Sequence, residues 1–140
     1  MKKINHLFIV MFVSVLCGCS TKTPSSLPIN DIKTTDNSTI INMSTSIDFN
    51  NEDELIIVDS LFLSKMASLV KNNSKKSQIV YLATHGDRSY LNNLQYRANK
   101  VREYFISKGV ETSTLTAELG FDYQTKYPKL KNSNLILHLQ

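Results

Sequence analysis

The chain contains 140 residues, with 16 Lys or Arg and 12 Asp or Glu, so its formal net charge is +4. Lys2 and Lys3 precede an N-terminal apolar run, and without them 14 basic and 12 acidic residues remain. This balance, and the lack of a Lys/Arg cluster interleaved with aromatic residues, gives no indication of a nucleic-acid partner.

The N-terminus has the pattern of a secretory signal. The two lysines are followed by ten mostly apolar residues, 7–16, and positive charge followed by an apolar stretch is the order found in such signals. A membrane-spanning helix needs about 20 apolar residues. The run is therefore too short to cross a bilayer.

The segment Leu16-Cys17-Gly18-Cys19 resembles the lipobox of bacterial lipoproteins. The resemblance implies that residues 1–18 are a lipoprotein signal peptide and that Cys19 becomes the N-terminus, carrying acyl chains such as palmitate. Ser20, where an Asp would favour retention in the inner membrane, implies an outer-membrane anchor with the protein facing the periplasm. Cys17 would leave with the signal, so Cys19 has no second thiol for a disulfide or metal site. The alternative is an ordinary signal peptide with a coincidental cysteine pair.

Residues 20–38 have the composition of a flexible tether. Twelve of these 19 residues are Ser, Thr, Asn or Pro. The segment therefore has too few apolar side chains for their burial to offset the entropy lost on ordering. The expected organisation is a lipidated tether over 19–38 and a globular domain over 39–140, about 100 residues and large enough for one core.

The first half of this domain predicts a strand and then a helix. Apolar and polar residues alternate over 41–49, the period of a half-buried strand. Asn50 and Asn51 interrupt this pattern, and acidic residues at 52–54 suit the positive N-terminal end of a helix dipole. Apolar residues at spacings of three and four predict that helix over about 52–71: Leu55, Val58, Phe62, Met66 and Leu69.

The second half predicts a strand, a helix and two more strands. Residues 79–83 form a short apolar run typical of a strand covered on both faces, and Gly109 marks the end of the second helix. Strands are expected at 114–119 and 134–139, separated by a loop containing Gly120 and Pro128. The order strand, helix, strand, helix, strand, strand predicts an α+β two-layer domain with a mixed sheet and helices on one face. The second helix is marked by Leu91, Leu94, Ala98, Val101 and Phe105.

Residues 97–110, RANKVREYFISKGV, resemble the second helix of OmpA-like peptidoglycan-binding domains. That pattern runs R-A-x-x-V, then an aromatic-leucine pair, then a glycine followed by Val or Ile. Residues 47–50 resemble the family's first strand, and residues 79–87 its second strand with the following turn. The resemblance covers about residues 39–140 and implies the OmpA-like fold.

The resemblance also implies a ligand, the zwitterionic diaminopimelate of the peptidoglycan stem peptide. Asp87 and Arg97 match the positions that bind its ammonium and carboxylate. An arginine presents a planar fork suited to a carboxylate, and hydrogen bonds between ions are roughly twice as strong as neutral ones. Each residue also has a structural alternative: Asp87 as a helix N-cap, and Arg97 as a solvated residue or as an ion pair with Glu103 or another acid.

Several family features are altered in this chain. The turn G-H-T-D reads Thr84-His85-Gly86-Asp87, only nine residues separate Asp87 from Arg97, and the N-R-R motif of the last strand reads Asn132-Ser133-Asn134. These changes affect the binding loop more than the core. They leave open an alternative function, a protein-interaction subunit of a secretion or conjugation apparatus that has lost peptidoglycan binding.

No catalytic function is expected. His85 lies near Asp87, as a general base would, but no nucleophile with an orienting partner accompanies it. The sequence predicts no cofactor and no metal site. The leading function is therefore an outer-membrane lipoprotein that binds peptidoglycan non-covalently and anchors the envelope, or an envelope-spanning complex, to the cell wall.

Overall fold

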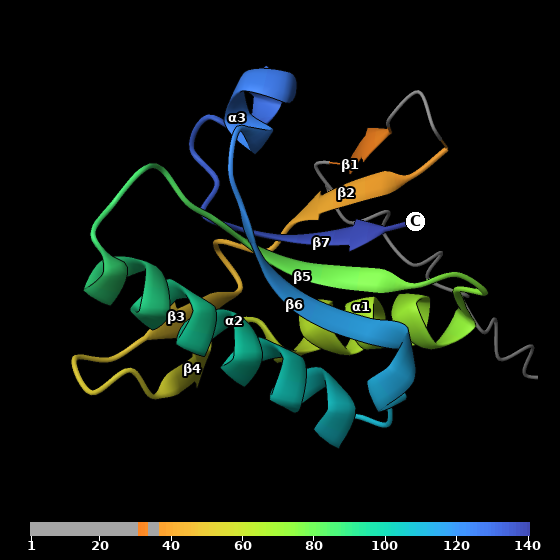
Figure 1. Cartoon of the computed structure of the whole chain (residues 1–140). Helices are drawn as coiled ribbons and strands as arrows, with labels where there is room; N and C mark the ends of the chain where they lie inside the picture. The colour runs from red at the N-terminus through yellow and green to blue at the C-terminus, as the bar shows by residue number, and fades with distance from the viewer. Residues whose placement is uncertain (1–30, 34–36) are drawn as a thin grey trace, which may run out of the picture.

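The computed structural model describes residues 31–33 and 37–140, and its centre is a five-stranded mixed sheet (Figure 1). The strand order is β1-β2-β7-β5-β6. Strands β5 and β6 pair in parallel and the other neighbours pair antiparallel. The strands are β1 (Asp31–Lys33), β2 (Thr39–Asn42), β5 (Ser77–Leu82), β6 (Leu115–Gly120) and β7 (Leu135–Leu139).

Two long helices, α1 (Ser60–Asn72) and α2 (Arg88–Ser107), cover one face of this sheet (Figure 1). Their buried faces pack with inward residues of the sheet strands in a single apolar cluster. A separate hairpin, β3 (Ile47–Phe49) with β4 (Leu55–Ile57), packs against the same cluster. The predicted α+β two-layer class is thus confirmed, with both long helices on one face.

The opposite face is partly covered by a segment that the sequence predicted only as a loop. It contains the one-turn helix α3 (Tyr123–Lys126) and the 3-10 helix η2 (Pro128–Leu130). Leu130 is buried there against residues of β2, β5 and β7, and Tyr123 and Tyr127 pack at the edge. The interior strand β5 is consequently buried on both sides, as its apolar run predicted.

The predicted continuous strand over 41–49 is wrong. The alternating pattern spans two strands, β2 and β3, which belong to different sheets and are separated by a turn. The Asn42 side chain accepts a hydrogen bond from the Ser44 backbone N–H (2.9 Å), and the Ser46 N–H donates to the Met43 carbonyl (3.0 Å). Such side-chain and backbone turn bonds offer an alternative to the strand ladder, which periodicity alone does not reveal.

The predicted helix over 52–71 begins too early. Leu55, Ile56 and Ile57 form β4, whose neighbour β3 supplies hydrogen-bond partners, and α1 begins at Ser60. Asp59 is the N-cap, because its carboxylate accepts from the Phe62 N–H (2.9 Å). The predicted buried face shifts accordingly, and the core residues of α1 are Phe62, Leu63, Met66, Ala67 and Val70.

The second half follows the prediction closely. The structure has β5, β6 and β7 within two residues of the expected bounds, and α2 contains all five apolar residues that marked the second helix. Gly109 follows α2 with φ +91, a left-handed conformation that favours glycine. The sheet begins before the expected domain start at Thr39, since β1 pairs with β2 from within the range assigned to the tether.

Cys19 and the signal segment lie outside the described residues. Among residues 31–33 and 37–140, no helix has the length and hydropathy needed to span a membrane.

The register of α1 is testable with two leucines. Leu63 is fully buried, whereas Leu61 is 64% exposed. Leu63→Ala is expected to lower the free energy of unfolding by about 2–5 kcal/mol, because it leaves a cavity in the core. The matched Leu61→Ala should change it by no more than about 0.5 kcal/mol. Chemical denaturation measures both, and equal losses would contradict the register.

Candidate functional site

Arg97 lies on the flank of α2, one position before the fully buried Ala98. Leu94 and Ala98 are buried in the core below it, so the backbone that carries the guanidinium is held in place. Its Nε and one terminal nitrogen both donate to one carboxylate oxygen of Asp53, at 2.8 and 2.6 Å. Both side chains are 29% exposed. The ion pair that the sequence left open for Arg97 is thus present, with Asp53 and not Glu103 as the acid.

Asp53 belongs to the turn between β3 and β4, which is ordered by the side chain of Asn50. The Asn50 amide oxygen accepts from the backbone N–H groups of Glu52 and Glu54, both at 2.9 Å. Asp53 itself has φ +58, a left-handed conformation that Asp tolerates better than most residues. This turn places the Asp53 carboxylate against α2.

Asn93 provides a second contact from α2 to the same carboxylate. Its amide nitrogen donates to the other Asp53 oxygen at 2.5 Å. Asn93 and Arg97 are four residues apart and therefore lie on the same side of the helix. Both Asp53 oxygens thus bind groups of α2, so this side of the helix acts as a carboxylate receptor.

Aromatic side chains form the apolar wall of the receptor. The Arg97 guanidinium carbon lies 4.9 Å from the centroid of the Phe49 ring, a cation-π geometry. The Phe49 ring contacts Tyr81, with centroids 6.4 Å apart. Burial raises the pKa of Tyr81, while its interaction with Arg97 opposes that rise. The Tyr81 hydroxyl therefore belongs to the same cluster of interacting groups.

Electrostatic effects keep both ions charged. The hydrogen bond from Arg97 lowers the pKa of Asp53, and this outweighs the opposing effect of desolvation. Desolvation lowers the pKa of Arg97, but hydrogen bonds to Asp53 and Tyr81 give a net rise. Because the pKa of Asp53 is below its ordinary value, its carboxylate is ionised at neutral pH. The ion pair is therefore lost only when acid protonates Asp53.

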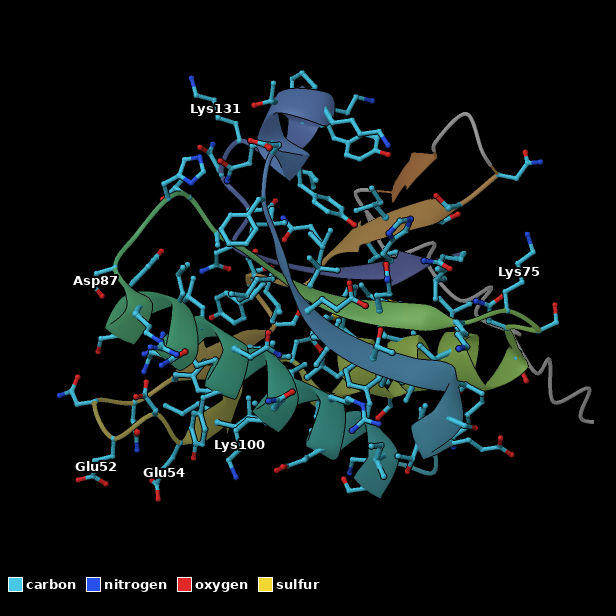
Figure 2. All side chains as sticks on the ribbon, viewed as in Figure 1. Glu52, Glu54, Lys75, Asp87, Lys100 and Lys131 are labelled. Carbon is cyan, nitrogen blue, oxygen red and sulfur yellow. The ribbon has the colours of Figure 1, made fainter. Side chains whose placement is uncertain are left out.

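Asp87 occupies the exposed beginning of α2, as Figure 2 shows. Its carboxylate accepts a hydrogen bond from the Tyr90 backbone N–H (2.8 Å), so it is the N-cap of the helix. Asp87 and Arg97 are ten residues apart, which corresponds to about 15 Å along the helix axis. The structure therefore places these two charges at separate levels of α2 and not side by side.

His85, considered in the sequence as a general base, and the exposed Tyr96 both have aromatic contacts. His85 stacks on Phe121, with ring centroids 6.2 Å apart and planes at 20°. Tyr96 is exposed, and its ring lies 5.4 Å from the Lys100 ammonium. Within the part of the chain that is described, no group of three or more His, Cys, Asp or Glu is placed to hold a metal ion.

Two residues of the site were missed in the sequence: Asn93 of the receptor and Asp53, the carboxylate bound to it. Asp53 was assigned to the first turn of a helix, where its partner could not be identified. The spacing of Asn93 and Arg97 is a visible signal, since residues four apart on a helix share a side. Their common partner is 40 or more positions earlier in the chain, and no local pattern indicates it.

No protein-family model matches the chain, and no curated protein matches it. Among solved structures, the chain is similar to a crystal structure described as a MotB-like protein from Desulfovibrio vulgaris, with 15% sequence identity and a TM-score of 0.58. The alignment covers 79% of this chain and 76% of that chain. At this identity the similarity concerns the fold, and it supports the same two-layer arrangement of sheet and helices.

Proposed function

We propose that this chain is a noncatalytic envelope protein whose OmpA-like domain binds peptidoglycan. The observation that carries the proposal is the carboxylate receptor on α2, in which Arg97 and Asn93 bind both oxygens of one carboxylate. The receptor lies on a fold similar to a MotB-like structure. Arg97 is also the residue that matches the ligand-binding arginine in the resemblance to OmpA-like domains.

The chemistry of the receptor suits a carboxylate of the stem peptide. The guanidinium fork is supported by a packed helix and bordered by Phe49, so little reorganisation is needed for binding. Partly exposed ion pairs contribute only about 0.2–1 kcal/mol. An incoming carboxylate can therefore displace Asp53 at small cost. In this proposal Asp53 occupies the receptor in the absence of ligand.

Asp87 is proposed to contact the ammonium group of diaminopimelate. Capping uses one carboxylate oxygen of Asp87, the one that accepts from Tyr90. An ionised carboxylate has about four acceptor sites on its two oxygens, so it can cap the helix and bind a cation together. Because Asp87 and Arg97 lie at separate levels of α2, they would contact different parts of an extended stem peptide.

The proposed location is the periplasmic side of the outer membrane, with Cys19 as the lipid anchor. One acyl chain gives only marginal membrane binding, whereas two or more anchor a protein stably. A tether before β1 would allow the domain to reach the cell wall. The lipobox-like sequence is the support for this part of the proposal.

A second candidate function is an interaction subunit of a secretion or conjugation complex. Four large apolar side chains are exposed on or near β4 and α1, namely Ile56, Val58, Leu61 and Leu69. Exposed apolar side chains of this size are available to contact a protein partner. In this alternative the domain keeps the OmpA-like fold and contacts envelope proteins instead of the cell wall.

Co-sedimentation with purified sacculi tests the leading function. The full-length chain in detergent is expected to pellet with sacculi. Arg97→Ala should weaken this binding about tenfold or more, because it removes charged hydrogen bonds to the ligand. Asp87→Ala should also weaken it.

Lys100→Ala is the matched control, since it removes a cation from the same helix three residues away and should leave binding unchanged. Failure of the wild type to pellet, or wild-type binding by both Asp87→Ala and Arg97→Ala, would contradict the proposed site. Failure to pellet together with specific cross-links to envelope proteins in cells would support the second candidate.

If Asp53 competes with the ligand for Arg97, removing its charge should strengthen binding to sacculi, whereas Arg97→Ala should weaken it. Asp53→Asn removes the internal carboxylate that occupies Arg97, so the affinity for sacculi should rise by about two- to fivefold. Glu52→Gln removes the same charge from the same turn but leaves the Arg97 contact intact, and it should not change the affinity. Equal effects of the two substitutions would show general electrostatic attraction and not competition.

The anchor is tested by metabolic labelling with palmitate. Wild type and Cys17→Ser should incorporate the label and sediment with membranes. Cys19→Ser should incorporate none and stay in the soluble fraction. Labelling of Cys19→Ser would exclude Cys19 as the acylated residue.

A further inference from the structure

Two neighbouring cavities lie beside the segment that follows β6. The first has a volume of about 140 Å³ and lies between this segment and the end of β5. The second has a volume of about 190 Å³ and extends toward Tyr127 and His138. Phe121, Asp122 and Tyr123 line both cavities. The two cavities are thus consecutive along one segment of chain.

An exposed aromatic ring separates the cavities. Phe121 is 42% exposed although its side chain is large and apolar. His85 lies beside it, with ring centroids 6.2 Å apart and planes at 20°, which favours this orientation of the Phe121 ring. A Phe held in this way presents an apolar surface to a ligand at little conformational cost.

The remaining lining is mixed. Leu82 and Ala83 line the first cavity beside polar side chains, and Lys126 lines the second, where its ammonium lies 5.2 Å from the centroid of the Tyr127 ring. Thr84, Gln124 and Thr125 line the first cavity, and Asp122 is the only carboxylate among the described residues that line it. No Lys or Arg is among the described residues that line it. Phosphate and other anions need such cations, so the lining of the first cavity disfavours them. A ring beside hydroxyl and amide groups suits a neutral ligand that has both apolar faces and hydroxyl groups, which is the chemistry of a saccharide.

The sizes of the cavities favour a chain-like ligand. Pockets that enclose a drug-sized molecule have volumes of roughly 300–1,000 Å³, and each cavity here is smaller. Two small adjacent cavities that share one aromatic ring suit consecutive units of a polymer. Tyr127 in the second cavity supplies a further ring, 6.0 Å from that of Tyr123.

We propose that these two cavities form a subsite for neutral N-acetylated sugars of a glycan strand. The inference rests on the proposed function and extends it from the stem peptide to the glycan. His85 lines the first cavity and is two residues before Asp87, the N-cap of α2, so a glycan in the cavities would lie near the beginning of that helix. Phe121 provides the stacking surface, and Thr84 and Thr125 provide hydrogen-bonding groups at its edges.

Titration of the full-length chain in detergent with chitohexaose, a neutral β-1,4-linked N-acetylglucosamine hexamer, tests the subsite. Phe121→Ala is expected to weaken the affinity about tenfold, and Phe121→Trp should retain it. Tyr96→Ala removes an aromatic ring of similar exposure on α2 and serves as the matched control with unchanged affinity. Thermal unfolding of each variant confirms that it is folded.

The outcomes separate this inference from the proposed function. Weakened chitohexaose binding in Phe121→Ala, with the Arg97-dependent part of sacculus binding unchanged, supports the subsite. Absence of chitohexaose binding by a wild-type chain that binds sacculi overturns the subsite and leaves the proposed function intact. Chitohexaose binding that responds equally to Phe121→Ala and Tyr96→Ala also overturns it. A third result would separate the two proposals: Phe121→Ala alone weakens chitohexaose binding, and sacculus binding does not depend on Arg97. That result supports the subsite and overturns the stem-peptide proposal.

Discussion

The packing of α2 on the sheet is the constraint on which the rest of the structure depends. Ala98 and Val101 are fully buried in this contact, and a side chain as small as Ala98 lets the helix lie close to the strands. This contact fixes the direction of α2, and therefore the position of every group on its flank. Arg97 and Asn93 can act as a receptor because the helix that carries them cannot rotate without opening the core.

The sequence predicted the parts of the fold that depend on local periodicity. α2 followed from its apolar spacing, because it is long enough to show a clear period, and β5 followed from a continuous apolar run. The segment from 41 to 58 did not, because the alternation of apolar and polar residues continues through the turn between β2 and β3 and does not show where one strand ends. Three apolar residues at 55–57 fit a helix face and a strand equally well, and only pairing with β3 decides between them.

The sequence predicted part of the candidate site, namely Arg97 and Asp87, but not the partner of Arg97. Arg97 and Asp87 could be named from their motif positions, and the capping role of Asp87 followed from its place before a helix. The partner of Arg97 could not be named, because Asp53 reaches it through a turn whose conformation depends on side-chain bonds from Asn50. A contact between residues 44 positions apart is a property of the tertiary structure. The sequence therefore identifies the cation, and the fold identifies its anion.

Asp87 connects the two proposed binding regions physically. Its carboxylate ends the loop that begins with Thr84 and His85, and it starts the helix that carries Arg97. If the cap were lost, the first turn of α2 would fray and the loop would lose its fixed end, so both regions would be disturbed together. A ligand that contacts the loop and the helix stabilises the same junction from both sides. This coupling gives an extended polymer with peptide branches an advantage over either of its parts, because each contact reduces the entropy that the other must overcome.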